Sequence, residues 1–300
     1  DPALGTFDDL LEEIRSRTDV RKWFITGEGL SRLKDPSALL SRFHPHPVTV
    51  IAYFRDPVEA APSLYTEHLK AGYHFTFDEW IEGKSTRWLD RITLMKPWHF
   101  AGLSRTGRVL ARLRLKQAAR FENPAVKIVQ RALDKDSLHG GNLMEDMLHL
   151  LSLGHQAAAF EFSPPAFSNP RISAAECIGL LFLNTLHREN EKMTAQQKVK
   201  DRLSLRRAIK QAFPHRTQRF GCTPRQQSRL RQLFGNDRPA PPGTPPAARE
   251  DADDELLDWL MAFKKDTYAT GTLSLARQKA HLFQEQQEYH PHFWLNDIPS

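Results

Sequence analysis

The stretch Val48-Thr-Val-Ile-Ala-Tyr-Phe-Arg55-Asp56-Pro57 carries the signals of a strand and, directly after it, of a helix. The run 48–54 is rich in β-branched and aromatic residues, which is typical of a buried strand. Asp followed by Pro often starts a helix, because Asp caps free backbone amides and Pro suits the first helical turn. The sequence therefore predicts a strand up to residue 54 and a helix from Pro57, with Arg55 at the tip of the strand.

Helical and strand patterns alternate on both sides of this stretch. Helical spacing of apolar residues covers 7–17 and 31–43, and we expect Pro36 to interrupt the second of these helices. A short apolar run at 22–27 predicts a strand, and 126–130 predicts another. Alternation of this kind indicates an α/β fold, in which a parallel sheet is flanked by crossover helices. The chain after residue 173 is mainly helical in pattern, so we expect a largely helical C-terminal half.

Composition divides the chain into three parts. Residues 1–235 form the predicted α/β domain, and the Pro-rich stretch 236–250 is a linker by composition. Residues 251–300 form a tail in which Leu256, Leu257, Leu260 and Phe263 make an apolar helical stripe. We expect this tail to dock on the main domain or on a partner.

The bulk composition argues against several classes of protein. The 300 residues are 40% hydrophobic, and no apolar run approaches the length that crosses a membrane. The N-terminal residues lack the pattern of a signal peptide, and two cysteines, Cys177 and Cys222, make no disulfide framework. The paired histidines at 44 and 46, and at 290 and 292, offer too few ligands for zinc, so we expect no metal. These features predict a cytoplasmic protein without a membrane span.

The net charge of +6 is unevenly distributed. Residues 188–231, called here the basic segment, hold 13 Lys and Arg against 3 Asp and Glu, a local balance of +10. Such a segment could face an anionic polysaccharide, an anionic cofactor or nucleic acid. It could equally form the solvated faces of ordinary surface helices.

Four stretches of the sequence, taken in their order along the chain, resemble the bacterial sulfotransferase-like proteins. This family is often linked to polysaccharide modification. The resemblance spans roughly residues 20 to 185. Its most specific element is Arg55-Asp56-Pro57 followed by Ser63-x-Tyr65. The other three are Phe24-Ile-Thr-Gly27-Glu28-Gly-Leu30, Phe75-x-Phe77-Asp-Glu-Trp80, and Gly141-Asn-Leu-Met-Glu145-Asp146-Met147 with Leu151-x-Leu153-Gly154.

The resemblance implies a P-loop-NTPase-like fold and the donor 3′-phosphoadenosine-5′-phosphosulfate (PAPS). It implies that Arg55 pairs with the 3′-phosphate and that Ser63 hydrogen-bonds the same group. These roles are chemically sound, since a dianionic phosphate needs a fixed cation and a short hydroxyl donor. The alternatives are a structural salt bridge for Arg55 and a bond from Ser63 back to the carbonyl of Glu59.

The family's Lys-x-Gly-Thr-Thr loop, which cradles the 5′-phosphosulfate, does not occur in the sequence. Either the chain is a fragment that lacks the N-terminal strand and this loop, or the loop has been lost. Glu28, between two glycines, is the best-placed general base for an acceptor hydroxyl, and its alternative role is a local cap or pair in an exposed turn.

Two functions follow from the sequence. In one, the chain transfers a sulfuryl group from PAPS to a hydroxyl of a carbohydrate or similar acceptor. In the other, it is a non-catalytic scaffold on a degenerate sulfotransferase fold, and its basic segment binds an anionic polymer.

Overall fold

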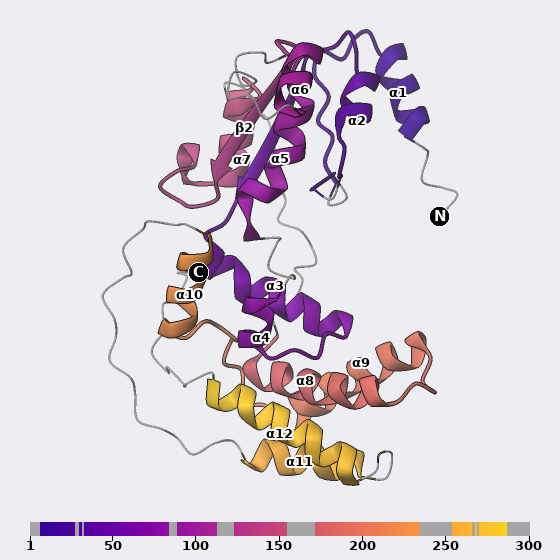
Figure 1. The fold of residues 1–300 in the computed structure, drawn as a ribbon, viewed down its shortest axis with the longest axis vertical. Helices are drawn as coiled ribbons and strands as arrows, with labels where there is room; N and C mark the ends of the chain where they lie inside the picture. The colour runs from indigo at the N-terminus through magenta and orange to yellow at the C-terminus, as the bar shows by residue number, and fades with distance from the viewer. Residues whose placement is uncertain are drawn as a thin grey trace. The chain divides into compact units, whose positions relative to one another are not determined.

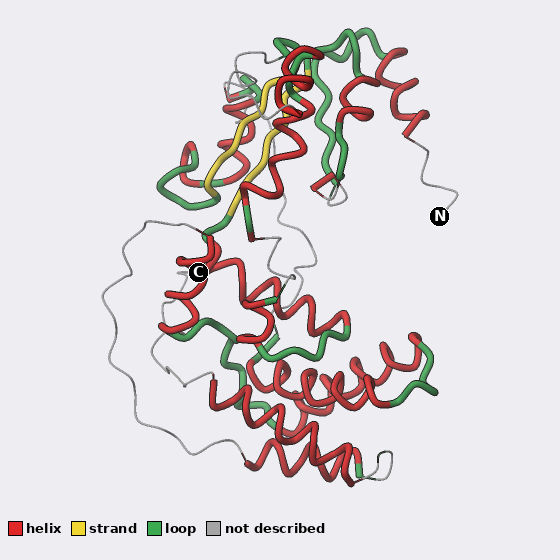
Figure 2. Tube along the Cα trace, in the orientation of Figure 1, coloured by secondary structure: helices red, strands yellow, loops and turns green. Residues whose placement is uncertain are grey.

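The computed structural model describes residues 7–27, 30–31, 33–83, 89–112, 123–154, 172–234, 254–265, 268 and 270–286. The chain divides into two compact units. Unit 1 holds Asp1–Phe54 and Asp90–Ala157, and unit 2 holds Arg55–Leu89 and Ala158–Ser300. The structure is a mixed α/β one that is mostly helical, with its strands in unit 1 (Figure 2). The expected α/β class is therefore present in this general form.

The sheet of unit 1 has two parallel strands within the described residues, β1 (Val48–Phe54) and β2 (Val126–Ala132). The register pairs Val48 with Val126 and Tyr53 with Arg131. Parallel neighbours need a long connection between them, and here that connection contains the whole first segment of unit 2. Both strands lie where the sequence predicted them.

Short helices surround this sheet in unit 1 (Figure 1). An apolar cluster joins α2 and α5 to the strands, with Met95 and Trp98 buried against side chains such as Val50 and Ile128. Burial of these apolar faces removes them from water, which is the main stabilising contribution here. The helical elements are α1 (Phe7–Ser16), α2 (Ser37–Arg42), α5 (Arg91–Ala101), α6 (Arg105–Arg112), η4 (His139–Gly141) and α7 (Leu143–Leu150).

One prediction near the N-terminus was wrong. Residues 22–27 form no strand, and Phe24 is 54% exposed. A strand needs a neighbouring strand for its backbone hydrogen bonds, and an apolar run in the sequence does not reveal whether that neighbour exists. The helical stretch expected over 31–43 is interrupted at Pro36, as predicted, and α2 begins after this residue, since Pro cannot supply an amide inside a helix.

Unit 2 is mainly helical within its described residues. Its first helix, α3, begins after an Asp56 N-cap and ends at Gly72, whose φ of 104° lies in the left-handed region that favours glycine. Thr76 and Glu79 form a capping box at α4. The helices are α3 (Pro57–Ala71), α4 (Phe77–Glu82), α8 (Ala174–Glu189), α9 (Ala195–Ala212), α10 (Pro224–Phe234), α11 (Asp254–Lys264) and α12 (Thr270–Gln286).

Helix α8 forms the centre of unit 2, with every residue from Ala175 to His187 buried. A helix that is buried on all sides needs neighbours all round, and α3, α9 and α12 provide them. Gly179 permits a close approach of α9, because a Cβ there would lie 2.3 Å from Cδ1 of Ile209. Asn184 donates to the carbonyls of Leu69 and Tyr73, at 2.8 and 2.7 Å, and so joins α8 to the end of α3.

The C-terminal helices belong to the core of unit 2. Leu256, Leu257 and Leu260 of α11 are fully buried, as the apolar stripe in the sequence predicted, whereas Phe263 is 41% exposed. Helix α12 packs along α8 through Ala276, Ala280 and Phe283. The predicted linker 236–250 lies outside the described residues.

Among the described helices, none combines the length and the apolar composition that crossing a bilayer requires.

Candidate functional site

Arg55 stands between β1 and the start of α3. Asp56 caps the helix, since its carboxylate accepts the amide of Val58 at 2.8 Å, and Pro57 occupies the first helical position. The amides of a first helical turn point outward along the axis and carry partial positive charge. The exposed Arg55 side chain therefore adds a full positive charge beside a helix N-terminus.

Ser63 lies two turns into the same helix. Glu59, Ser63 and Glu67 are exposed at four-residue spacing, so they form one outward face of α3. Among the described residues, the Ser63 hydroxyl has no hydrogen bond to the carbonyl of Glu59, and the Arg55 guanidinium has no salt bridge. Both side chains are therefore available to a ligand, and the carboxylate of Glu59 lies on the face that such a ligand would approach.

Helix α3 continues through Pro62 without a break. Proline has no amide hydrogen, so the carbonyl of Val58 lacks its usual partner in the helix. The thiol of Cys222 donates to that carbonyl, with 3.5 Å between Sγ and O. Nothing in the sequence pointed to Cys222 as the replacement donor.

The surroundings of Cys222 bring a second arginine toward the start of α3. Burial and the nearby Asp56 carboxylate raise the pKa of the Cys222 thiol, and the Arg231 guanidinium acts in the opposite direction. Arg231 lies on α10, which packs against α3, and its buried Nε has no hydrogen-bond partner in the described part of the chain. In the sequence, Arg231 is one cation of the basic segment, and no local signal indicates that it lies near the start of α3.

The structure places Arg55 and Ser63 in one unit, Arg55 directly before the N-cap of α3 and Ser63 two turns into that helix. Glu28, the predicted general base, lies outside the described residues. The described geometry therefore concerns the predicted phosphate-binding residues alone. The role of Glu28 as a general base stays a prediction.

A buried carboxylate organises the sheet end of unit 1. Asp146 of α7 is fully buried and accepts hydrogen bonds from the Tyr53 hydroxyl at 2.8 Å, the His139 amide at 2.9 Å and the Arg131 guanidinium. Burial alone would raise the pKa of Asp146, but these donors outweigh it and lower the pKa to about 2. Arg131 also donates to the carbonyl of Ser137 at 2.7 Å. This network fixes α7 and its preceding turn to the strands.

Several cations of the basic segment are used inside unit 2. Arg206 pairs with the buried Glu176 at 2.9 Å, Arg229 with Glu82 at 2.5 Å, and Arg216 with Glu255 at 2.9 Å. Arg202 is 9% exposed, and desolvation lowers the pKa of its guanidinium. Part of the local charge of +10 is therefore engaged in contacts between helices.

A second buried network joins α8, α9 and α11. The carboxylate of Asp201 accepts from His187 Nε2 at 2.9 Å and from the ammonium of Lys264. Burial opposes ionisation of Asp201, yet these two partners lower its pKa. Within the described residues, no group of three or more His, Cys, Asp or Glu side chains has an arrangement that would hold a metal ion.

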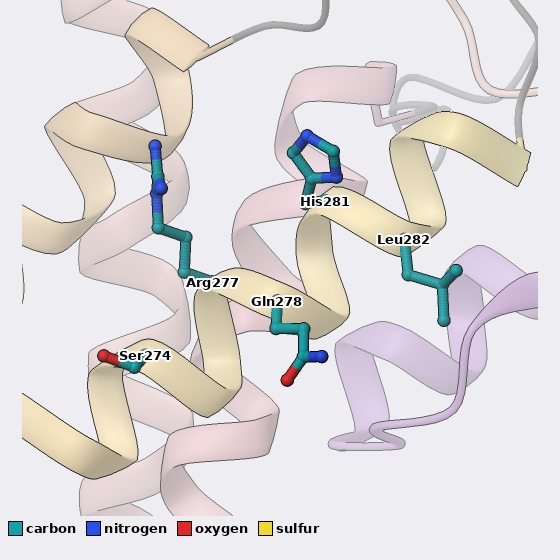
Figure 3. A pocket seen from close by; sticks show the side chains of 5 residues that line it. All are labelled: Ser274, Arg277, Gln278, His281 and Leu282. Atoms are coloured by element: carbon teal, nitrogen blue, oxygen red, sulfur yellow. The ribbon is translucent and has the colours of Figure 1, made fainter.

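An open hollow of about 460 Å³ lies along α12 (Figure 3). Its lining side chains occupy one stripe of the helix: Ser274, Arg277, Gln278, His281 and Leu282. Arg277 is engaged with Asp258 of α11 at 2.8 Å. This hollow lacks the convergent polar groups of a reaction centre, and the start of α3 remains the better candidate site.

Comparison with family models, with curated proteins and with solved structures found no match to this chain.

Proposed function

We propose that the start of α3 binds a phosphate group of a nucleotide and that the chain is a sulfotransferase-like protein that uses PAPS. The observation that carries this proposal is the pair formed by Arg55 and Ser63. Arg55 is exposed at the start of α3, Ser63 is exposed two turns into the same helix, and both lack a partner among the described residues. A guanidinium, a hydroxyl and a helix dipole together favour a dianion.

The proposed binding mode assigns a separate task to each group. Arg55 supplies the fixed charge and a bidentate pair of donors to the 3′-phosphate, and Ser63 donates one further hydrogen bond. The Asp56 side chain is occupied as the N-cap and so closes the strand-to-helix turn. The P-loop-like architecture expected from the resemblance belongs to the same proposal.

The chemical step that we propose is transfer of the sulfuryl group to a hydroxyl of a carbohydrate or similar acceptor. A general base removes the hydroxyl proton, the acceptor oxygen bonds to sulfur, and adenosine 3′,5′-bisphosphate leaves. Glu28 is the proposed base.

Calorimetric titration with adenosine 3′,5′-bisphosphate tests the phosphate site. We expect the wild-type chain to bind and Arg55→Ala to weaken binding by about 10- to 100-fold, because charge-assisted hydrogen bonds are lost. Lys200→Ala removes one exposed cation from α9 of the same unit and should leave the affinity unchanged. Absence of binding in the wild type, or equal losses in the two variants, would reject the site.

The scaffold function has its own supporting observation on α9. Val199 and Leu203, each 47% exposed, lie beside the exposed Lys200 and Arg207. An anionic polymer bound there would show strongly salt-dependent affinity, which Lys200→Ala and Arg207→Ala would reduce. Heparin binding that falls steeply with salt, together with no binding of the bisphosphate, would favour the scaffold over the enzyme.

A further inference from the structure

The first turns of α3 contain a backbone defect within the proposed phosphate site. Pro62 leaves the carbonyl of Val58 without an amide donor, and this carbonyl lies between Arg55 and Ser63 along the chain. A carbonyl without a partner favours local opening of the helix or its hydration. Such opening would change the direction in which Ser63 points.

The Cys222 thiol fills the position of the missing donor. Its Sγ lies 3.5 Å from the Val58 oxygen, across a sequence separation of 164 residues. Burial and the Asp56 carboxylate keep the thiol protonated at neutral pH by raising its pKa, so it can act as the donor. An S–H···O bond is weak, but here it satisfies an acceptor that the helix itself cannot.

Cys222 is held by a rigid segment. The Gln227 side chain donates to the Cys222 carbonyl at 3.2 Å, and Thr223 and Gln226 exchange hydrogen bonds of 3.0 and 3.3 Å. Gln226 also donates to Asp78 of α4 at 2.6 Å. The thiol therefore approaches α3 from a fixed direction.

We propose that Cys222 is a positioning residue for the phosphate site of α3. By donating to the carbonyl that Pro62 leaves free, it holds the helical turns between Arg55 and Ser63 in the geometry that binds phosphate. This inference rests on the proposed function.

A double-mutant cycle of Cys222→Ala and Pro62→Ala tests the inference, with the dissociation constant for adenosine 3′,5′-bisphosphate as the readout. Pro62→Ala restores the backbone amide and makes the thiol unnecessary. We expect Cys222→Ala to weaken binding about fivefold when Pro62 is present and less than about twofold when it is replaced. The packing lost with the sulfur atom is the same in both backgrounds, so it cancels in the cycle.

Cys222→Ser retains a hydrogen-bond donor and should bind within about twofold of the wild type, since a hydroxyl donates more strongly than a thiol. Equal losses from Cys222→Ala in both backgrounds, or a Ser variant as weak as the Ala variant, would overturn the positioning role alone. A wild-type chain that does not bind the bisphosphate would overturn the proposed function and the positioning role together.

Discussion

Arg131 and Arg55 occupy similar places in the sequence pattern but have opposite roles in the structure. Arg131 lies near the carboxyl end of β2, where it binds the buried Asp146 and the Ser137 carbonyl. Arg55 follows the carboxyl end of β1 and is exposed, with no salt bridge among the described residues. The difference shows that an arginine at a strand end becomes structural when a carboxylate folds against it. When no such carboxylate is present, the charge remains available to a ligand.

Mutations at the two sites should therefore change different measured quantities, stability at one site and ligand affinity at the other. Loss of a group from the Asp146 network should lower stability, because a buried charge loses its counter-charge. Loss of a group from the start of α3 should lower affinity for a phosphate and leave stability nearly unchanged.

The largest expected effect is that of Asp146→Ala. We expect the free energy of unfolding of unit 1 to fall by about 3 kcal/mol, because the Arg131 guanidinium and the Tyr53 hydroxyl lose a buried acceptor. Urea unfolding, together with amide hydrogen exchange in β1 and β2, measures this loss of stability. Asp136→Ala, an exposed change in the same unit, should alter stability by less than about 0.5 kcal/mol. Similar losses in the two variants would mean that the Asp146 network is dispensable.

Low pH should lower the stability of unit 1, because it protonates the same carboxylate, that of Asp146. The pKa of Asp146 is lowered from 3.8 to about 2, so its contribution is complete above pH 4 and is lost as pH falls through 2. The stability lost in this window is about 2 kcal/mol. Asp146→Asn should lack this part of the pH dependence, and an unchanged acid profile in that variant would assign the loss to other groups.

Ser63→Ala should have a smaller effect, confined to binding. We expect about tenfold weaker affinity for adenosine 3′,5′-bisphosphate, the usual consequence of losing one hydrogen bond to a charged group. Ser204→Ala, an exposed serine of α9 in the same unit, is the matched control and should bind like the wild type. Wild-type affinity in Ser63→Ala would restrict the site to Arg55 and the helix start.

The smallest expected effect is a gain from Glu59→Gln. Removal of a carboxylate from the exposed face of α3 should tighten bisphosphate binding about two- to threefold at low salt, because like charges repel. The gain should disappear at high salt. Glu67→Gln removes the same charge about two turns farther from Arg55, where the residue pairs with Lys70 at 2.7 Å, and should have less effect. Equal gains would indicate a general charge effect and no local site.

Several elements were predictable because their signals are local. The apolar run 48–54 became β1, Asp56 and Pro57 began α3, and the stripe around Leu260 is buried in α11. Capping and short-range periodicity act between residues a few positions apart, so they are visible in a sequence. The expected strand at 22–27 failed because strand formation depends on a distant partner.

The sequence by itself determined where Arg55 stands, at the point where a strand signal gives way to a helix signal. It also determined that Pro62 would remove a hydrogen bond from that helix. Only the tertiary structure decided that the Cys222 thiol replaces this bond and that Asp146 neutralises Arg131. Pairings of this kind join residues far apart in the chain, and the packing that brings them together has no signature in either local segment.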